Sequence, residues 1–211
     1  MWQSISYYAA LVLESALGVF GIRIYEEPRY EVIDHLSDRV EIRRYGPRVA
    51  VEVQLASADE AERSRAFQLL FRYIAGANRM QASGGNTMAM TTPVEVRDRE
   101  LVAMTVPVET VDSRDTGHMR FFLPSKYGLD SAPKPENPAV RLAKVPEETI
   151  ATLRFSGSPT YVAKRKAELV KKLAGTNWQP TSAPYTLFYD APFTLPFLRR
   201  NEAAVAVARR A

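Results

Sequence analysis

The chain has 211 residues, of which 46% are hydrophobic and 25% are charged, a composition typical of a globular protein rather than a disordered or fibrous one. It contains no cysteine, which excludes disulfides, thiolate nucleophiles and sulfur-bound zinc. Lys and Arg number 28 against 24 Asp and Glu, and short basic clusters alternate with acidic residues along the sequence. This distribution is typical of a solvated surface, so we expect no nucleic-acid partner.

The first 27 residues differ in composition from the rest of the chain. Between Met1 and Ile22 the only charged residue is Glu14, and apolar residues recur at helical spacing. We expect an N-terminal apolar helix over residues 1–27, which docks on its own domain or on a partner protein, or contacts a membrane surface through residues 1–25. A secretory signal would have basic residues before the apolar run, and this chain has none, so a degraded signal sequence is only the third interpretation. The expected location is the cytoplasm or the periphery of the inner membrane rather than outside the cell.

From Tyr30 onward, similar segments recur about one hundred residues apart. Residues 40–45 and 140–145 both alternate apolar and polar side chains, which predicts two half-buried strands. A second strand is expected after each of them, over residues 49–55 and 149–155. The sequence therefore indicates an internal repeat.

A helix is expected after each pair of strands. In the first half Ser57 and Glu60 have the spacing of a capping box, and in the second half Ser158 is the expected cap. Both helices are expected to end near a glycine, Gly76 or Gly175, which favours the left-handed cap. The apolar stripes are Phe67, Leu70, Phe71 and Ile74 in the first helix, and Val162, Leu169, Val170 and Leu173 in the second.

Further strands complete two β-β-α-β-β units. They are expected over residues 88–96, 101–107 and 119–123 in the first half, and over 185–189 and 203–208 in the second. One unit alone has too little core to be stable. We therefore predict one α+β domain over residues 28–211. In it, units of about 30–125 and 138–208 pair with pseudo-two-fold symmetry into a distorted β-barrel or sheet with two helices.

The sequence offers little that suggests catalysis. It has no G-x-S-x-G elbow, no phosphate-binding loop, no G-x-G-x-x-G and no H-E-x-x-H. The two histidines, His35 and His118, are far apart, and a surface or structural role is expected for each. Met88 and Met90 share one face of a predicted strand and offer thioethers to a haem iron, although core packing is the favoured interpretation. We expect a protein that is not an enzyme and has no catalytic residue and no metal site.

Apolar residues at two places instead predict a ligand cleft. The first helix has more apolar residues than one stripe needs, with Arg63 and Arg72 at the edges of this surface. The proline-stiffened segment 189–197 presents Phe193, Leu195 and Phe197. An apolar wall, a stiff apolar loop and arginines suit a flat hydrophobic ligand that bears carboxylates. The alternative is that the loop closes over the core of the sheet.

Six short motifs in the same order resemble those of the SOUL / haem-binding protein family. They lie at residues 41–46, 66–78, 90–94, 122–124, 154–157 and 192–202, the last with Phe197-Leu198-Arg199-Arg200-Asn201-Glu202. The resemblance extends from about residue 30 to 208. It implies a duplicated α+β fold and non-covalent binding of haem or another tetrapyrrole in an apolar cleft.

The resemblance also implies positions for the ligand site. By position the wall consists of Phe67, Leu70 and Phe71, Arg72 lies near the propionates, and Phe193, Leu195 and Phe197 form the lid. Some relatives have a histidine inside the E-I-R-x-Y-G motif, where this chain has Arg44, a residue that stays protonated and cannot ligate iron. We therefore expect apolar contacts and carboxylate pairing to hold the ligand.

The expected function is that of a tetrapyrrole carrier, buffer or chaperone. Two alternatives stay open. One is an effector-binding module for another flat hydrophobic ligand. The other is an interaction subunit that docks on a larger, membrane-bound assembly through its apolar loop and N-terminal helix.

Overall fold

The computed structural model describes residues 26–57, 59–79, 88, 92–97, 117–190 and 194–210. Several predicted features lie outside these residues: the N-terminal helix up to residue 25, the strand over 101–107, Met90, and the loop tip that includes Phe193.

The described residues form a large antiparallel sheet and a separate two-stranded ladder. Along the main sheet the order is β1-β2-β9-β12-β11-β5-β6-β3-β8, with β10 paired to β12, and β4 pairs β7 in the ladder. The strands are β1 (Tyr30–Ser37), β2 (Val40–Tyr45), β3 (Arg48–Gln54), β4 (Asn78–Arg79), β5 (Val94–Arg97), β6 (His118–Phe122), β7 (Lys134–Pro135), β8 (Val140–Val145), β9 (Glu148–Phe155), β10 (Trp178–Pro180), β11 (Tyr185–Phe188) and β12 (Asn201–Arg209).

Between β2 and β8, the two halves of the strand order correspond to each other in reverse. Exchanging β2 with β8, β3 with β9, β5 with β11 and β6 with β12 reproduces the order in reverse. These are the strands that the sequence predicts to correspond in the two units. The order agrees with a pairing of two related units, whose duplication and symmetry stay a prediction.

Two α-helices cover the sheet, α2 (Glu60–Ile74) and α3 (Val162–Leu173). The predicted cap of α2 is wrong by two residues: Asp59 caps the helix by accepting a hydrogen bond from the backbone N–H of Glu62, and Ser57 donates to Asp59. The carboxylate of Glu62 accepts from the N–H of Ala56, which completes the turn.

The second helix also begins later than predicted. A 3₁₀ turn, η1 (Pro159–Tyr161), comes first, and Ser158 accepts from the N–H of Thr160 in that turn rather than capping α3. Both helices are followed by a glycine with positive φ, 115° at Gly76 and 81° at Gly175, as predicted.

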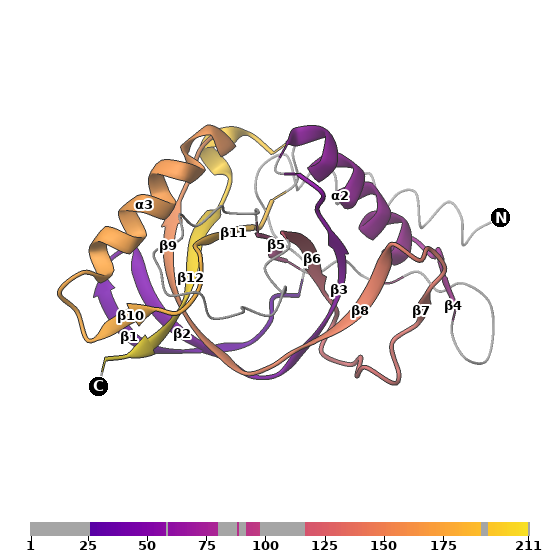
Figure 1. The fold of residues 1–211 in the computed structure, drawn as a ribbon, viewed down its shortest axis with the longest axis horizontal. Coiled ribbons are helices and arrows are strands. Elements are labelled where there is room, and N and C mark those ends of the chain that lie inside the picture. Colours follow the sequence, from indigo (N-terminus) through magenta and orange to yellow (C-terminus); the bar gives the residue numbers. More distant parts are fainter. Residues whose placement is uncertain are drawn as a thin grey trace, which may run out of the picture.

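Each helix packs on one half of the outer face of the sheet, which we define as the face that α2 and α3 cover (Figure 1). Under α2 the core includes Val51, Leu70, Tyr73, Val96 and Phe121. Under α3 it includes Ile42, Leu153, Leu169, Leu173 and Val205. Met88 is buried in the first of these cores, which confirms core packing for this residue.

The opposite, inner face lines the inside of the curled sheet and combines charged side chains with two smaller apolar clusters, which include Tyr185 and Phe122. Alternate residues of the same strands point to it, because successive side chains of a strand point to opposite faces. Across β8, β3, β6 and β5 the register aligns Arg141, Glu52, Arg120 and Glu95 in one cross-strand row. The curl makes the sheet a half-barrel, and the α+β class is confirmed (Figure 1).

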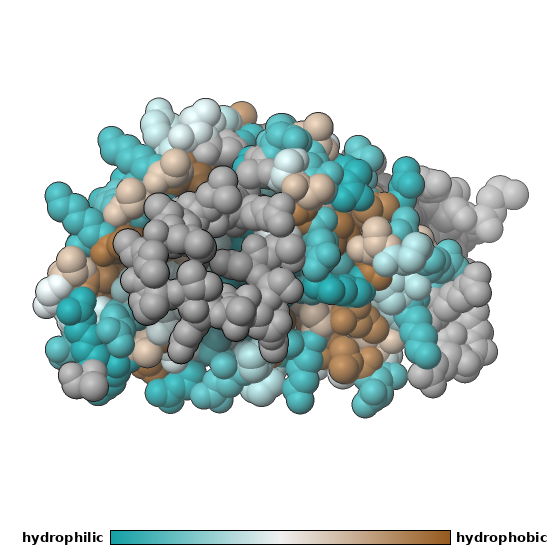
Figure 2. All heavy atoms as spheres, viewed as in Figure 1, coloured by the Kyte–Doolittle hydropathy of each residue, from teal (hydrophilic) through white to brown (hydrophobic). Residues whose placement is uncertain are grey.

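Apolar side chains are not confined to the core. Figure 2 shows hydrophobic side chains at the surface over the region of α2 and β8. The large hydrophobic residues that are exposed include Phe71 on α2, Tyr161 and Val170 at α3, and Leu195, Phe197 and Leu198 before β12.

Neighbouring residues of α2 have different roles, which a pair of substitutions will separate. Leu70 is completely buried, so Leu70→Ala leaves a cavity and is expected to lower the free energy of unfolding by about 2–5 kcal/mol. Phe71 is half exposed, and Phe71→Ala is expected to cost at most about 1 kcal/mol. Urea unfolding of both variants measures these costs, and equal losses would contradict the assignment of Leu70 to the core.

Candidate functional site

One edge of α2 is aromatic and faces the middle of the sheet. The ring of Phe67 stacks on that of Phe71, with centroids 6.2 Å apart, and meets Phe121 of β6 edge-on at 5.4 Å. Phe67 is half-buried against the core, whereas Phe71 is 49% exposed. Since β6 leads through β5 to β11 at the centre of the sheet, this edge points towards the junction of the two halves.

The other two residues expected on this wall point elsewhere. Leu70 has no exposed surface and belongs to the core beneath the helix. Arg72 is exposed on the far side of α2, because successive residues of an α-helix point about 100° apart. The structure therefore brings Phe67 and Phe71 together but separates them from Leu70 and Arg72.

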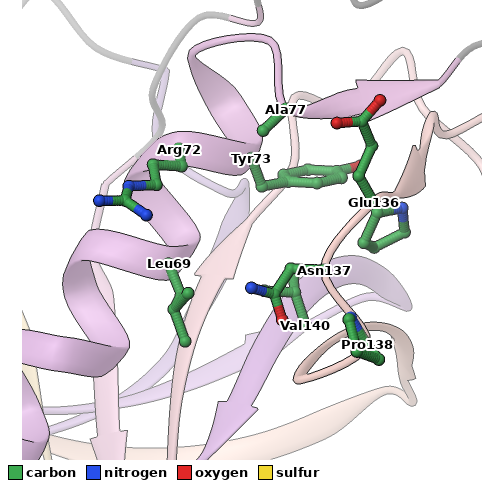
Figure 3. A pocket seen from close by; sticks show the side chains of 9 residues that line it. Leu69, Arg72, Tyr73, Ala77, Glu136, Asn137, Pro138 and Val140 are labelled. Carbon is green, nitrogen blue, oxygen red and sulfur yellow. The ribbon is translucent and has the colours of Figure 1, made fainter.

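Arg72 borders a different cleft, between α2 and the segment that leads into β8. This cleft has a volume of about 360 Å³ and is lined by Leu69, Arg72, Tyr73, Ala77, Pro135, Glu136, Asn137, Pro138 and Val140. In Figure 3 the Tyr73 ring extends across the cleft towards Glu136, while the guanidinium of Arg72 points away from its centre. The hydroxyl of Tyr73 donates to the carbonyl of Pro133 at 2.7 Å.

A basic residue lies on the aromatic edge itself. Arg63 is four residues before Phe67 and eight before Phe71, so all three lie along one side of α2. Its guanidinium is 3.7 Å from the carboxylate of Glu60, which is almost fully exposed. A ligand carboxylate at this edge would meet Arg63 rather than Arg72.

The expected lid residues lie on a short 3₁₀ turn, η2 (Pro196–Leu198). Leu195 is 36% exposed and Phe197 is 70% exposed, so the described part of the segment presents apolar side chains to solvent. Two anchors fix its backbone: the carbonyl of Thr194 accepts from the Nε of Arg199 at 2.7 Å, and the carbonyl of Pro196 accepts from the N–H of Gly157.

The inner face carries a different kind of site, a network of buried ion pairs. One oxygen of Glu95 accepts hydrogen bonds from Arg97, His118 and Arg120 at 2.9–3.1 Å. Burial alone would raise the pKa of Glu95, but the charge of Arg97 and the hydrogen bond from His118 outweigh it and hold this pKa well below its usual range. Glu52 is held in the same way by Arg120 and Arg141.

A second cluster surrounds Glu202 of β12, which has no exposed surface. Its carboxylate accepts from Arg43 at 2.7 Å, from the Tyr189 hydroxyl at 2.8 Å and from Arg200 at 2.9 Å. Burial raises the pKa of Glu202, and the positive charges of Arg43 and Arg200 more than reverse this, so that the carboxylate stays ionised. A carboxylate saturated by arginines is a poor proton carrier, so this cluster suits structure better than acid–base chemistry.

The described residues include no group of three or more His, Asp or Glu side chains arranged to hold a metal ion. Within the same residues, none of the helices is long and apolar enough to cross a membrane.

A comparison of the whole sequence with models of known protein families identifies the family. The model of the SOUL heme-binding protein family matches residues 25–206, most of the chain. The chain belongs to this family. No curated protein sequence matches the chain.

Solved structures with the same fold come from proteins of very low sequence identity. The C-terminal domain of EcmrR aligns with a TM-score of 0.56 at 9% identity, over 86% of this SOUL-family chain and 99% of that one. An uncharacterized conserved protein from Listeria innocua aligns with a TM-score of 0.57 at 12% identity, over 81% and 92% of the two chains. EcmrR in a complex with DNA aligns at 0.58 and 9% identity, over 100% of this chain and 65% of that one. At these identities the similarity establishes the fold alone.

Some residues of the candidate surface were not singled out from the sequence. Phe188 of β11 is partly buried and packs against the core under α2, to which Phe67 also belongs. Its neighbours Tyr185 and Leu187 face inward. Since side chains alternate along a strand, the outward direction of Phe188 could be predicted once the direction of these neighbours is known. The buried charges of the inner face resemble solvent-facing residues in the sequence and give no such signal.

The Glu202 cluster predicts a specific loss of stability on substitution and at low pH. Glu202→Gln leaves Arg43 buried beside a neutral side chain and is expected to cost about 3–5 kcal/mol at neutral pH. The matched control is Glu31→Gln, which breaks an exposed ion pair with Arg44 and should cost less than about 1 kcal/mol.

The sign of the pH effect follows from the lowered pKa values of Glu52, Glu95 and Glu202 in the folded protein. Their contribution is complete above the pKa of an unfolded Glu, about 4.3, and is lost as the pH falls towards the folded values. Urea unfolding from about pH 7 to about pH 3 should therefore show falling stability in the unmodified protein and a smaller fall in Glu202→Gln. A pH-independent stability would contradict the ionised state of these carboxylates.

Proposed function

We propose that the protein binds haem or a related tetrapyrrole non-covalently, as a carrier or buffer, and that the aromatic edge of α2 is the ligand-contacting surface. The observation that carries this proposal is the half-exposed ring of Phe71, stacked on Phe67 in a chain of a haem-binding family. A flat apolar ligand that covers Phe71 would remove apolar surface from water. The entropic cost of ordering this side chain would be small, because its ring is already stacked on Phe67.

Apolar contact and carboxylate pairing, rather than iron ligation, are the proposed binding forces. Three side chains that could ligate iron have other roles: His118 binds Glu95, the Tyr73 hydroxyl donates to Pro133, and Met88 is buried in the core. The exposed His35 lies on β1, at the other end of the sheet from the strands that α2 covers. Arg44, at the position of the family histidine in the E-I-R-x-Y-G motif, points to solvent beside Glu31. The residues present therefore fit a porphyrin ring better than a specific iron centre.

The remaining contacts of the proposed site are a lid and a basic partner. Leu195 and Phe197 are exposed and stiffly held, and with Phe193 they would cover the second face of the ring. Arg63 lies along the aromatic edge, and the side chain of Arg72 is exposed at the end of α2. Either guanidinium would pair with a propionate, and the proposed geometry favours Arg63.

A metal-free ligand should bind about as well as the iron complex. Titration of the purified protein with haem and with protoporphyrin IX, followed by absorbance and by quenching of ligand fluorescence, is expected to give dissociation constants within about tenfold of each other, or about 1.4 kcal/mol. A stronger preference for haem, together with the spectrum of low-spin iron with two axial ligands, would contradict binding without iron ligation.

The aromatic edge predicts the effect of one substitution on both ligands. Phe71→Ala is expected to weaken the binding of haem and of protoporphyrin IX by about tenfold or more, because the largest exposed apolar surface of α2 is lost. Leu129→Ala is the matched control, since Leu129 is similarly exposed but lies in the segment between β6 and β7. Unchanged affinity in Phe71→Ala, or equal losses in both variants, would rule out this edge as the binding surface.

A further inference from the structure

The net charge of the protein is concentrated in one helix. Within α3 there is one acidic residue, Glu168, against five basic ones: Lys164, Arg165, Lys166, Lys171 and Lys172. The helix therefore carries a charge of +4, which equals the net charge of the whole chain, since 28 basic residues face 24 acidic ones. The other 23 basic and 23 acidic residues cancel.

The outward side of α3 is built for a close approach to a surface. Leu169 and Leu173 face the sheet, so Lys164, Ala167 and Lys171 lie on the opposite side, and Ala163 and Val170 lie on the flank beside them. All five residues are exposed, and neither lysine forms an ion pair with a described residue. Along the edge of the molecule where α3 lies in Figure 1, Figure 2 shows hydrophilic side chains with paler, more apolar ones between them.

Exposed apolar residues adjoin the start of this helix. Tyr161, the last residue of η1, is 53% exposed and packs over Gly157. The N–H of Gly157 donates to the carbonyl of Pro196, which places η2 with its exposed Phe197 and Leu198 against the same end of α3. These exposed apolar residues therefore adjoin the helix that carries the exposed Lys164 and Lys171.

We propose that this surface, formed by the outward side of α3 together with η1 and η2, docks the protein onto a membrane rich in anionic lipid. The lysines would pair with the negatively charged headgroups, and Phe197, Leu198 and Tyr161 would enter the boundary between headgroups and acyl chains. The proposal concerns the ligand-free protein, because Phe197 is also a lid residue of the proposed tetrapyrrole site.

The composition of the surface favours a lipid bilayer over a nucleic acid or an acidic protein. A nucleic acid would use the lysines through its phosphates, but it would leave the aliphatic side chains of Leu195 and Leu198 in water. Small residues between the lysines keep the helix face flat, which suits an extended planar surface. A bilayer satisfies both the charged and the apolar parts at once.

The test compares two charge-reversed proteins that have the same net charge. In the first, Lys164→Glu and Lys171→Glu are combined; in the second, Lys134→Glu and Lys144→Glu are combined on β7 and β8, where both residues are exposed. Binding of the ligand-free full chain to phosphatidylcholine vesicles with and without about 30 mol% phosphatidylserine is measured by co-sedimentation at low salt, where electrostatic attraction is strongest.

The expected result is binding to the anionic vesicles that falls more than tenfold in the α3 variant and changes by less than about threefold in the control, because each lysine near the surface contributes about 1 kcal/mol. A third variant, Phe197→Ala, should also bind more weakly. Circular dichroism and urea unfolding check that all variants are folded.

Four outcomes would overturn the proposal. Equal losses in the two charge-reversed proteins would mean a non-specific effect of net charge. Unchanged binding in the α3 variant would place any membrane contact elsewhere, and equal binding to neutral vesicles would remove the role of the lysines. Binding to random-sequence duplex DNA but not to vesicles would assign the surface to nucleic acid.

Discussion

A carboxylate without contact with water has to be neutralised by its neighbours, and at Glu202 this requirement fixes the positions of several segments at once. Arg43 comes from β2, Arg200 from the residue before β12, and the Tyr189 hydroxyl from the end of β11. Arg43 also binds Glu41, and Arg200 binds Glu27, so the cluster extends to the first described residues of the chain. Displacing any one of these segments would leave a buried charge unpaired, at a cost of several kcal/mol.

Buried carboxylates are neutralised by arginines in the first half of the sheet as well, and this bears on where a ligand can bind. Glu52 and Glu95 lie between arginines of neighbouring strands, and Arg48 links to Glu148 where the chain crosses from one half to the other. The buried carboxylates of the inner face are thus paired with arginines of this chain. The outer face is covered by two helices, and its exposed apolar side chains lie at their edges. The proposed ligand surface uses one such edge of α2, and the proposed membrane surface uses the outward side of α3 together with η1 and η2.

The individual strands and helices could be predicted from the sequence, because each depends on residues that are close together in the chain. Alternation located β2 and β8 to the residue, and glycines located the ends of both helices. The candidate site was less accessible, since periodicity places Leu70 and Phe71 on one apolar stripe although one is in the core and the other is half exposed. Arg72 follows Phe71 in the sequence yet borders another cleft. The burial of Glu202 was hidden because its partner Arg43 is 159 residues away.

The position of β12 has a consequence for how the protein is made. This strand is the last element of the chain, but it lies between β9 and β11 inside the sheet and also pairs with β10. During synthesis the second half therefore has an open gap in its sheet, and Arg43 lacks its partner Glu202, until residues 201–209 have left the ribosome. Folding of this half then waits for the synthesis of β12, and a chain without this strand exposes unpaired edges on β9, β10 and β11 that invite aggregation.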